Sequence, residues 1–312
     1  MFEEGIALFN SDGNQDYTDA SSNDCSMSSP STGIGVFGVS AYKIDDDPNP
    51  DELLMDSASR GGTSTEGPTG HTLRAEEDVA LNPQYSTGRF GHSSGATPAV
   101  TGAAALFRQW YIDTQGSAID DPGLLYTALL MMGDRSTQSG FLTTGFDNLH
   151  GAGKLRLRML DLGGTDSPAG WALGSACVDD GTSTYIDIGG GLQLTGAMDY
   201  IHAVIWWYDK SHDDYGGNDF DKVDLYLERK STQYGAWSTS MSNTDDDNKQ
   251  MVFKGSDVPN YWYRLRLSGR DVASDLSGCG TNSNRIYYGW IYEDNARNDD
   301  ADLTTYVRPE EW

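Results

Sequence analysis

Short apolar runs alternate with helical patterns in the first half of the chain. Residues 5–9 (GIALF) and 33–41 (GIGVFGVSA) are apolar and bounded by turn residues, which is typical of buried parallel strands. Small residues at 98–105 lead into larger apolar residues and predict a closely packed buried helix. A second helix is predicted to begin at Asp121-Pro122, because a capping residue there precedes a proline in the first turn. This alternation predicts an α/β fold with a partial parallel sheet.

The second half lacks helical patterns and follows a period of two. Apolar and polar positions alternate in four short segments, residues 201–207, 223–227, 261–267 and 285–292. Acidic or glycine-rich loops separate these segments, and several short strands at such spacing predict an antiparallel β-sandwich, jelly-roll-like in type. We therefore expect two domains, an α/β domain over residues 1–168 and an all-β sandwich over residues 169–312.

The charge of the chain narrows the classes of partner. Its 312 residues carry 47 acidic and 21 basic side chains, for a formal net charge of −26. Nucleic acid is therefore not expected as a partner, since phosphate binding requires a basic face. No apolar run reaches the length that spans a membrane, so we expect no membrane partner. Such acidity is typical of a protein that functions in a salt solution, or of one that binds hard cations such as calcium.

Acidic loops in the second half provide the candidate metal ligands. Asp219, Asp221 and Asp224 lie close together in the sequence and can bind calcium, because this ion prefers carboxylate oxygens. The alternative is that these side chains are only solvated, as most carboxylates are in an acidic protein.

Cysteine is scarce, and its spacing limits its chemistry. The chain has Cys25, Cys177 and Cys279, an odd and widely spaced set that excludes a zinc motif. Cys177 and Cys279 both lie in the second half and can pair there. Such a pair would leave Cys25 free, or bonded outside the chain.

Two adjacent serines lie in the stretch GHSSGATPAVTGAAAL, residues 91–106. Residues 91–95 match G-x-S-x-G, the nucleophile elbow of esterases, with Ser93 at its centre. An elbow requires an apolar strand directly before the serine, and residues 82–90 are polar and turn-rich. Ser94 instead opens a helix, where unpaired N–H groups favour negative charge and can stabilise an oxyanion. The sequence therefore favours Ser94 over Ser93 as the nucleophile.

Residues 94–102 (SGATPAVTG) resemble the serine segment of subtilisin-like proteases, G-T-S-M-A-[TS]-P-x-V-A-G. In that resemblance Ser94 is the nucleophile. Residues 11–14 (SDGN) resemble the family's A-A-G-N, whose asparagine completes the oxyanion hole, and this assigns that role to Asn14. Residues 205–225 follow the order of a W-x-D segment, an acidic loop and a D-L strand, which resembles the branch of the family that carries a C-terminal β-sandwich.

The resemblance implies a secreted serine endopeptidase that acts on polypeptides and requires no cofactor for catalysis. The family places its catalytic aspartate and histidine before the oxyanion asparagine, and no histidine here occurs in an H-G-T-x-V-A-G context. We therefore expect this chain to be the C-terminal portion of a protease, with the aspartate and histidine supplied by an N-terminal portion or a partner chain. The alternatives are a non-catalytic subtilase-like binding protein, and an esterase that uses Ser93.

Two residues beside the candidate nucleophile depart from the family pattern. His92 stands where the family usually has glycine, and Gly95 where it has a bulky residue. A side chain at position 92 can obstruct the scissile carbonyl, and this departure is what keeps the non-catalytic alternative open.

Overall fold

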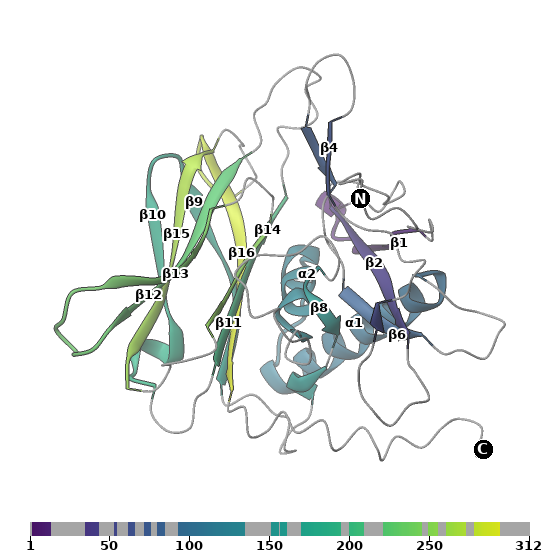
Figure 1. Ribbon diagram of the computed structural model, residues 1–312, viewed down its shortest axis with the longest axis horizontal. Coiled ribbons are helices and arrows are strands. Elements are labelled where there is room, and N and C mark those ends of the chain that lie inside the picture. Colours follow the sequence, from purple (N-terminus) through teal and green to yellow (C-terminus); the bar gives the residue numbers. More distant parts are fainter. Residues whose placement is uncertain are drawn as a thin grey trace.

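The computed structural model describes residues 2–13, 35–43, 53–54, 62–65, 72–75, 80–84, 93–134, 151–155, 157–160, 170–194, 200–208, 221–244, 249–254, 260–272 and 278–293. Figure 1 shows a β-sandwich of two sheets on the left, the helices in the middle and most of the remaining, largely parallel sheet on the right. The predicted fold class is confirmed, since an α/β part with a parallel sheet is followed by an antiparallel sandwich.

The first half of the chain forms a six-stranded sheet. Its strands are β1 (Leu8–Ser11), β2 (Val36–Lys43), β3 (Leu53–Leu54), β6 (Ala80–Gln84), β7 (Gly133–Asp134) and β8 (Gly153–Leu155). The order is β1-β2-β6-β8-β7, with β3 paired to β2. Strands β1, β2, β6 and β8 run parallel, whereas β3 and β7 are antiparallel to their neighbours. A separate hairpin pairs β4 (Gly62–Thr65) with β5 (Thr72–Ala75).

Two helices accompany this sheet, α1 (Ser93–Gln115) and α2 (Pro122–Met131). Helix α2 begins where the sequence predicts, because the backbone N–H of Gly123 donates to Asp121 Oδ1 at 3.0 Å. Helix α1 begins at Ser93 and contains Pro98. Proline has no N–H, so the carbonyl oxygen of Ser94, one turn earlier, has no backbone donor from that position.

The second half forms two four-stranded antiparallel sheets. One has the order β10-β15-β12-β13 and the other β14-β11-β16-β9. Their bounds are β9 (Gly170–Asp179), β10 (Ser183–Asp187), β11 (Tyr200–Trp207), β12 (Lys222–Lys230), β13 (Ser238–Asn243), β14 (Lys249–Lys254), β15 (Trp262–Asp271) and β16 (Ser283–Glu293). Every second residue of β12 and β15 faces a shared apolar core, for example Val223, Leu225 and Leu265. All four strands predicted from the period of two are confirmed.

Helix α2 is buried on nearly all sides because it lies between the parallel sheet and the sandwich (Figure 1). The Tyr126 ring packs edge-on against Trp206 of β11, with ring centroids 5.4 Å apart. On the other side, the Tyr126 hydroxyl accepts the backbone N–H of Leu8 at 2.6 Å and lies 3.0 Å from the carbonyl oxygen of Gly35. One core thus extends from β1 and β2 through α2 into the sandwich.

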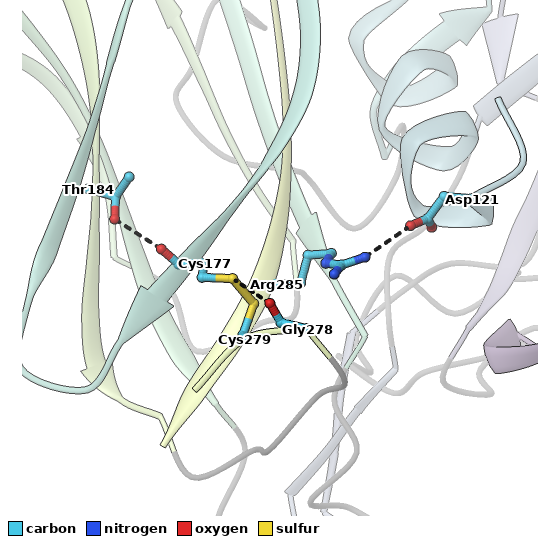
Figure 2. Close-up of a disulfide and its surroundings, with 6 residues drawn as sticks. All are labelled: Asp121, Cys177, Thr184, Gly278, Cys279 and Arg285. Carbon is cyan, nitrogen blue, oxygen red and sulfur yellow. Dashed lines mark hydrogen bonds and ion pairs between the residues drawn. A yellow bond between two sulfur atoms is a disulfide. The ribbon is translucent and has the colours of Figure 1, made fainter. Parts of the chain in front are cut away.

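A disulfide joins Cys177 of β9 to Cys279, just before β16, with their Cα atoms 5.6 Å apart. The proposed pairing of these two cysteines is confirmed, while Cys25 lies outside the described residues. Figure 2 shows this disulfide near Arg285, which reaches Asp121 Oδ2 at the start of α2 at 3.8 Å. The same carboxylate oxygen accepts the hydroxyl of Tyr287 at 2.9 Å, so the sandwich contacts the capping residue of α2 directly.

Some boundaries differ from the sequence prediction. Strands β1 and β2 begin three residues later than the apolar runs that predicted them, at Leu8 and Val36. Strand β6 includes Asn82 and Pro83, although the polar, turn-rich sequence from residue 82 predicts no strand there. Here tertiary pairing outweighs local propensity, since β2 and β8 flank β6 on both sides.

Candidate active site

The carboxyl end of β1 lies beside the middle of β2 and meets the N-terminus of α1. The backbone N–H of Asp12, directly after β1, donates to the Val39 carbonyl of β2 at 3.0 Å. Helix α1 contacts β1, β2 and β6 and brings Ser93 beside the end of β1. In sheets of parallel strands this edge is where ligands bind, because strand ends and helix N-termini converge there.

The two adjacent serines have opposite environments. Ser93 is 1% exposed, and its hydroxyl points into the protein. Ser94 is exposed at the first turn of α1. A helix of 23 residues has unpaired N–H groups and a positive dipole end at this turn, which stabilise negative charge. Of the two hydroxyls, that of Ser94 is therefore the one available to an external substrate.

A closed ring of hydrogen bonds ties the end of β1 to α1. The Ser93 hydroxyl donates to the Gly13 carbonyl at 2.9 Å, and Ser11 Oγ lies 2.6 Å from Ser93 Oγ. Because Ser93 uses its one proton on Gly13, Ser11 is the donor between the two hydroxyls. The Gly13 N–H then donates to Ser11 Oγ at 3.3 Å and closes the ring. Gly13 has a φ of 106°, a conformation that glycine adopts readily and other residues rarely do.

Asp12 lies beside this ring and is fully buried, with 0% of its surface exposed. Burial raises the pKa of Asp12 from 3.8 to about 7, and the neighbouring hydroxyls of Ser40 and Ser93 partly oppose this rise. Neither carboxyl oxygen has a hydrogen-bond partner within the part of the chain that the structure describes. Burial therefore outweighs the effect of the two nearby hydroxyls and favours the neutral form of the carboxyl group below about pH 7.

Two residues discussed for the candidate site, one predicted to be catalytic and one that departs from the family pattern, lie outside the described residues. Asn14, the candidate oxyanion residue, directly follows Gly13, and His92 directly precedes Ser93. Of the five histidines in the sequence, His202 is the one that the structure describes, and it is buried in β11 of the sandwich. The oxyanion role of Asn14 stays a prediction. The hydrogen-bonded ring includes Gly13, the residue directly before Asn14 in the sequence.

The three candidate calcium ligands do not appear together in the described structure. Asp219 lies outside the described residues. Asp221 is buried and accepts the Asn284 side-chain amide at 2.6 Å. Asp224 lies 3.2 Å from both the Arg270 guanidinium and the Tyr226 hydroxyl. Within the described ranges, no three His, Cys, Asp or Glu side chains form a group that can hold a metal ion.

Sequence analysis missed the roles of Ser11, Asp12 and Ser93. The signal was present in the SDGN segment, where Asp12 replaces a small apolar residue of the A-A-G-N pattern. Burying an acidic side chain directly after a strand costs free energy of folding unless another group pairs with it. A residue of this kind is therefore a candidate for a functional role.

No protein-family model and no curated protein matches the chain. Among solved structures, the chain shows distant similarity to a maturation protease and to a tripeptidyl peptidase. The prenylagaramide maturation protease PagA has 23% identity and a TM-score of 0.34 over 50% of this chain and 49% of PagA. Tripeptidyl peptidase 2 has 11% identity and a TM-score of 0.28 over 92% of this chain and 32% of that protein.

A third solved structure is also distantly similar to part of the chain. The mitogen YPM from Yersinia pseudotuberculosis has 11% identity and a TM-score of 0.26, over 43% of this chain and 93% of the mitogen. All three TM-scores are below 0.5, so these likenesses do not establish an activity. Among the described helices, none is long and apolar enough to cross a membrane.

Proposed function

We propose that this chain is part of a secreted subtilisin-like serine endopeptidase, with Ser94 as the nucleophile. The observation that carries the proposal is the contrast between the two serines. Ser94 is exposed at the N-terminus of α1, whereas Ser93 is buried and hydrogen-bonded to Gly13. The placement of Ser94 at the carboxyl edge of a parallel sheet supports the same conclusion.

In the proposed reaction, Ser94 Oγ attacks the carbonyl carbon of the scissile peptide bond. The tetrahedral oxyanion is stabilised by the Ser94 backbone N–H and by the Asn14 side-chain amide. The C–N bond then breaks, the leaving amine takes up the proton released by Ser94, and an acyl-enzyme remains. Water attacks the acyl group, releases the second product as a carboxylic acid and returns the proton to Ser94.

The general base is a histidine from outside this chain, held by an aspartate that is also supplied by an N-terminal portion or a partner chain. This part of the proposal rests on the sequence, in which no histidine occurs in the family's H-G-T context. A serine hydroxyl without a base is a weak nucleophile at neutral pH. The chain without its complementing portion should therefore show only a residual rate, about 10³–10⁴-fold above water.

The disulfide supports the proposed compartment. Cys177 and Cys279 are bonded, which is typical of proteins in oxidising surroundings. The net charge of −26 suits an extracellular protein that works in salt. Secretion is the part of the proposal that these two observations support.

The test is hydrolysis of peptide amides and simple esters by the complete protein, including the portion with the histidine. Ser94→Ala should lower kcat/KM for peptides by about 10⁴-fold or more, whereas Ser117→Ala, an exposed serine just beyond the C-terminal end of α1, should have no effect. Loss of ester hydrolysis in Ser93→Ala with an active Ser94→Ala would instead establish the esterase. A folded protein that hydrolyses neither substrate would establish the non-catalytic alternative.

A further inference from the structure

The outer face of one sandwich sheet carries a cluster of arginine and aromatic side chains. This sheet, β10-β15-β12-β13, lies on the side of the sandwich away from the helices (Figure 1), while α2 contacts the other sheet. Along β15, successive residues alternate between the apolar core and the outer face. Arg264 and Arg266 are two of the outward residues, and they lie opposite Glu228 and Tyr226 of β12.

A single carboxylate holds both guanidinium groups. Glu228 is 7% exposed, and Arg266 Nε donates to its Oε1 at 2.8 Å. Arg264 Nε donates to Glu228 Oε2 at 2.8 Å, and Arg264 Nη2 lies 2.7 Å from the same oxygen. Each guanidinium has five N–H donors, and Glu228 accepts only part of them. The two arginines and the glutamate together therefore carry one positive charge and have donors for a further acceptor.

Aromatic rings pack against the same two arginines. The Arg264 guanidinium carbon lies 4.0 Å from the centre of the Tyr185 ring and 4.3 Å from that of the Trp237 ring. The Arg266 guanidinium carbon lies 3.7 Å from the centre of the Tyr226 ring. Because stacking already restricts these long side chains, a ligand that binds them loses little of its affinity to their ordering. Tyr185 is 51% exposed, so part of its ring remains open to solvent.

The charge of this face differs from that of the whole chain, which has 21 basic and 47 acidic residues. The charged residues at outward positions of β10, β12 and β15 include Lys230, Arg264, Arg266 and Arg270 on the basic side and Asp187, Asp224 and Glu228 on the acidic side. Repulsion from acidic groups elsewhere on the chain is screened beyond about 8 Å at physiological salt. The arginine pair can therefore attract a nearby anion although the net charge of the chain is −26.

The position of the arginines within the sheet favours a polysaccharide ligand over a peptide. Peptides that bind a sheet usually pair their backbone with its edge, or they lie in a groove. Both arginines lie on β15, between β10 and β12, and the outer face there presents side chains only. A polysaccharide carries sugar rings and polar groups along one chain, so a ring can stack on an aromatic side chain while a carboxylate accepts from a guanidinium. The contacts with Glu228 show that these guanidinium groups accept a carboxylate as a partner.

We propose that the outer face around Arg264, Arg266 and Tyr185 binds an acidic polysaccharide. A carboxylate of the polymer accepts from the guanidinium donors that Glu228 does not use, and a neighbouring sugar ring packs on the exposed part of Tyr185. The binding surface belongs to the sandwich alone, so this inference does not depend on the proposed protease activity.

Isothermal titration calorimetry of the complete protein with oligomers of polygalacturonate tests the proposal, at physiological salt and with EDTA to prevent calcium from bridging two acidic molecules. Arg266→Gln removes one guanidinium and should raise the Kd about tenfold or more. Tyr185→Ala removes an exposed ring and should raise the Kd about three- to tenfold. Arg108→Gln is the matched control, because Arg108 is an exposed arginine on α1 that pairs with Asp120, and its Kd should equal that of the wild type.

The outcomes separate the possible ligands. Wild type that does not bind polygalacturonate, or unchanged affinity in both Arg266→Gln and Tyr185→Ala, would overturn the proposal. Equal affinity for neutral dextran would refute the role of charge, and equal affinity for polyglutamate would refute the preference for a polysaccharide. Urea unfolding checks that each variant is folded. If Arg266→Gln does not fold, Tyr185→Ala and the comparison with dextran and polyglutamate still decide the question.

Discussion

Replacing Asp12 by asparagine tests whether burial raises the pKa of this carboxyl group. The measurement is the pH dependence of the free energy of unfolding. The pKa of Asp12 is raised from 3.8 to about 7 in the folded protein. Below pH 3.8 the carboxyl is protonated in both the folded and the unfolded chain. As the pH rises toward 7, the unfolded chain releases its proton while the folded protein keeps it, so the free energy of unfolding falls. Above pH 7 both states are ionised and the loss is complete.

The size of the effect follows from the shift. About three pH units at about 1.4 kcal/mol each amount to about 4 kcal/mol between pH 3.8 and pH 7. The chain has a pI of about 4.2, so measurements begin above that value, where the protein is charged and soluble. About 2 kcal/mol of this loss in the free energy of unfolding falls between pH 5.5 and pH 8.5. The free energy of unfolding of Asp12→Asn, relative to that of the wild type, should therefore rise by about 2 kcal/mol from pH 5.5 to pH 8.5.

Urea unfolding followed by tryptophan fluorescence measures this difference, with Asp113→Asn as the control. Asp113 is exposed on α1 and accepts the Gln109 side-chain amide at 3.0 Å, so its replacement also removes one negative charge. Asp12→Asn should separate from both the wild type and the control as the pH rises. A stability difference between Asp12→Asn and wild type that is equal at pH 5.5 and pH 8.5 would refute the reasoning.

Four further predictions concern the two helices and the sandwich. In Gly123→Ala the added Cβ overlaps the Tyr287 ring, so we expect a loss of about 1–3 kcal/mol in urea unfolding. Gly102→Ala, where a Cβ meets no atom within 4 Å, should instead gain about 0.5–1 kcal/mol. Reduction of the disulfide, which closes a loop across 102 positions, should cost about 2–5 kcal/mol by the same assay; an unchanged unfolding midpoint would contradict this. If the acidic loop binds calcium, calcium should raise the Tm in calorimetry, and Asp221→Asn should remove that increase.

The parts of the fold that follow local rules were predictable from the sequence. Asp121-Pro122 predicts the start of α2 because capping is a contact between residues only two positions apart. The period of two in residues 201–207 identifies β11, since one face of each sandwich sheet must be apolar. The pairing of Cys177 with Cys279 was one of several possibilities that the sequence left open.

The parts decided by distant contacts were not predictable. Strand β6 contains Asn82 and Pro83, and its pairing with β2 and β8 determines its conformation. The ring at the candidate site joins Ser93 to Gly13, which lie 80 residues apart in the chain. No local pattern predicts a hydrogen bond between residues that far apart. The sequence therefore favoured Ser94 through the predicted start of a helix and the family resemblance, without revealing what Ser93 does.

The most direct test of the central claim is the site at which a fluorophosphonate reacts with the complete protein. Mass spectrometry of the digested adduct can separate the two serines, because fragment ions between positions 93 and 94 assign the added mass. The account predicts a single adduct on Ser94, since Ser93 is buried and bonded to Gly13. An adduct on Ser93, or no adduct on folded protein that still cleaves peptides, would contradict it.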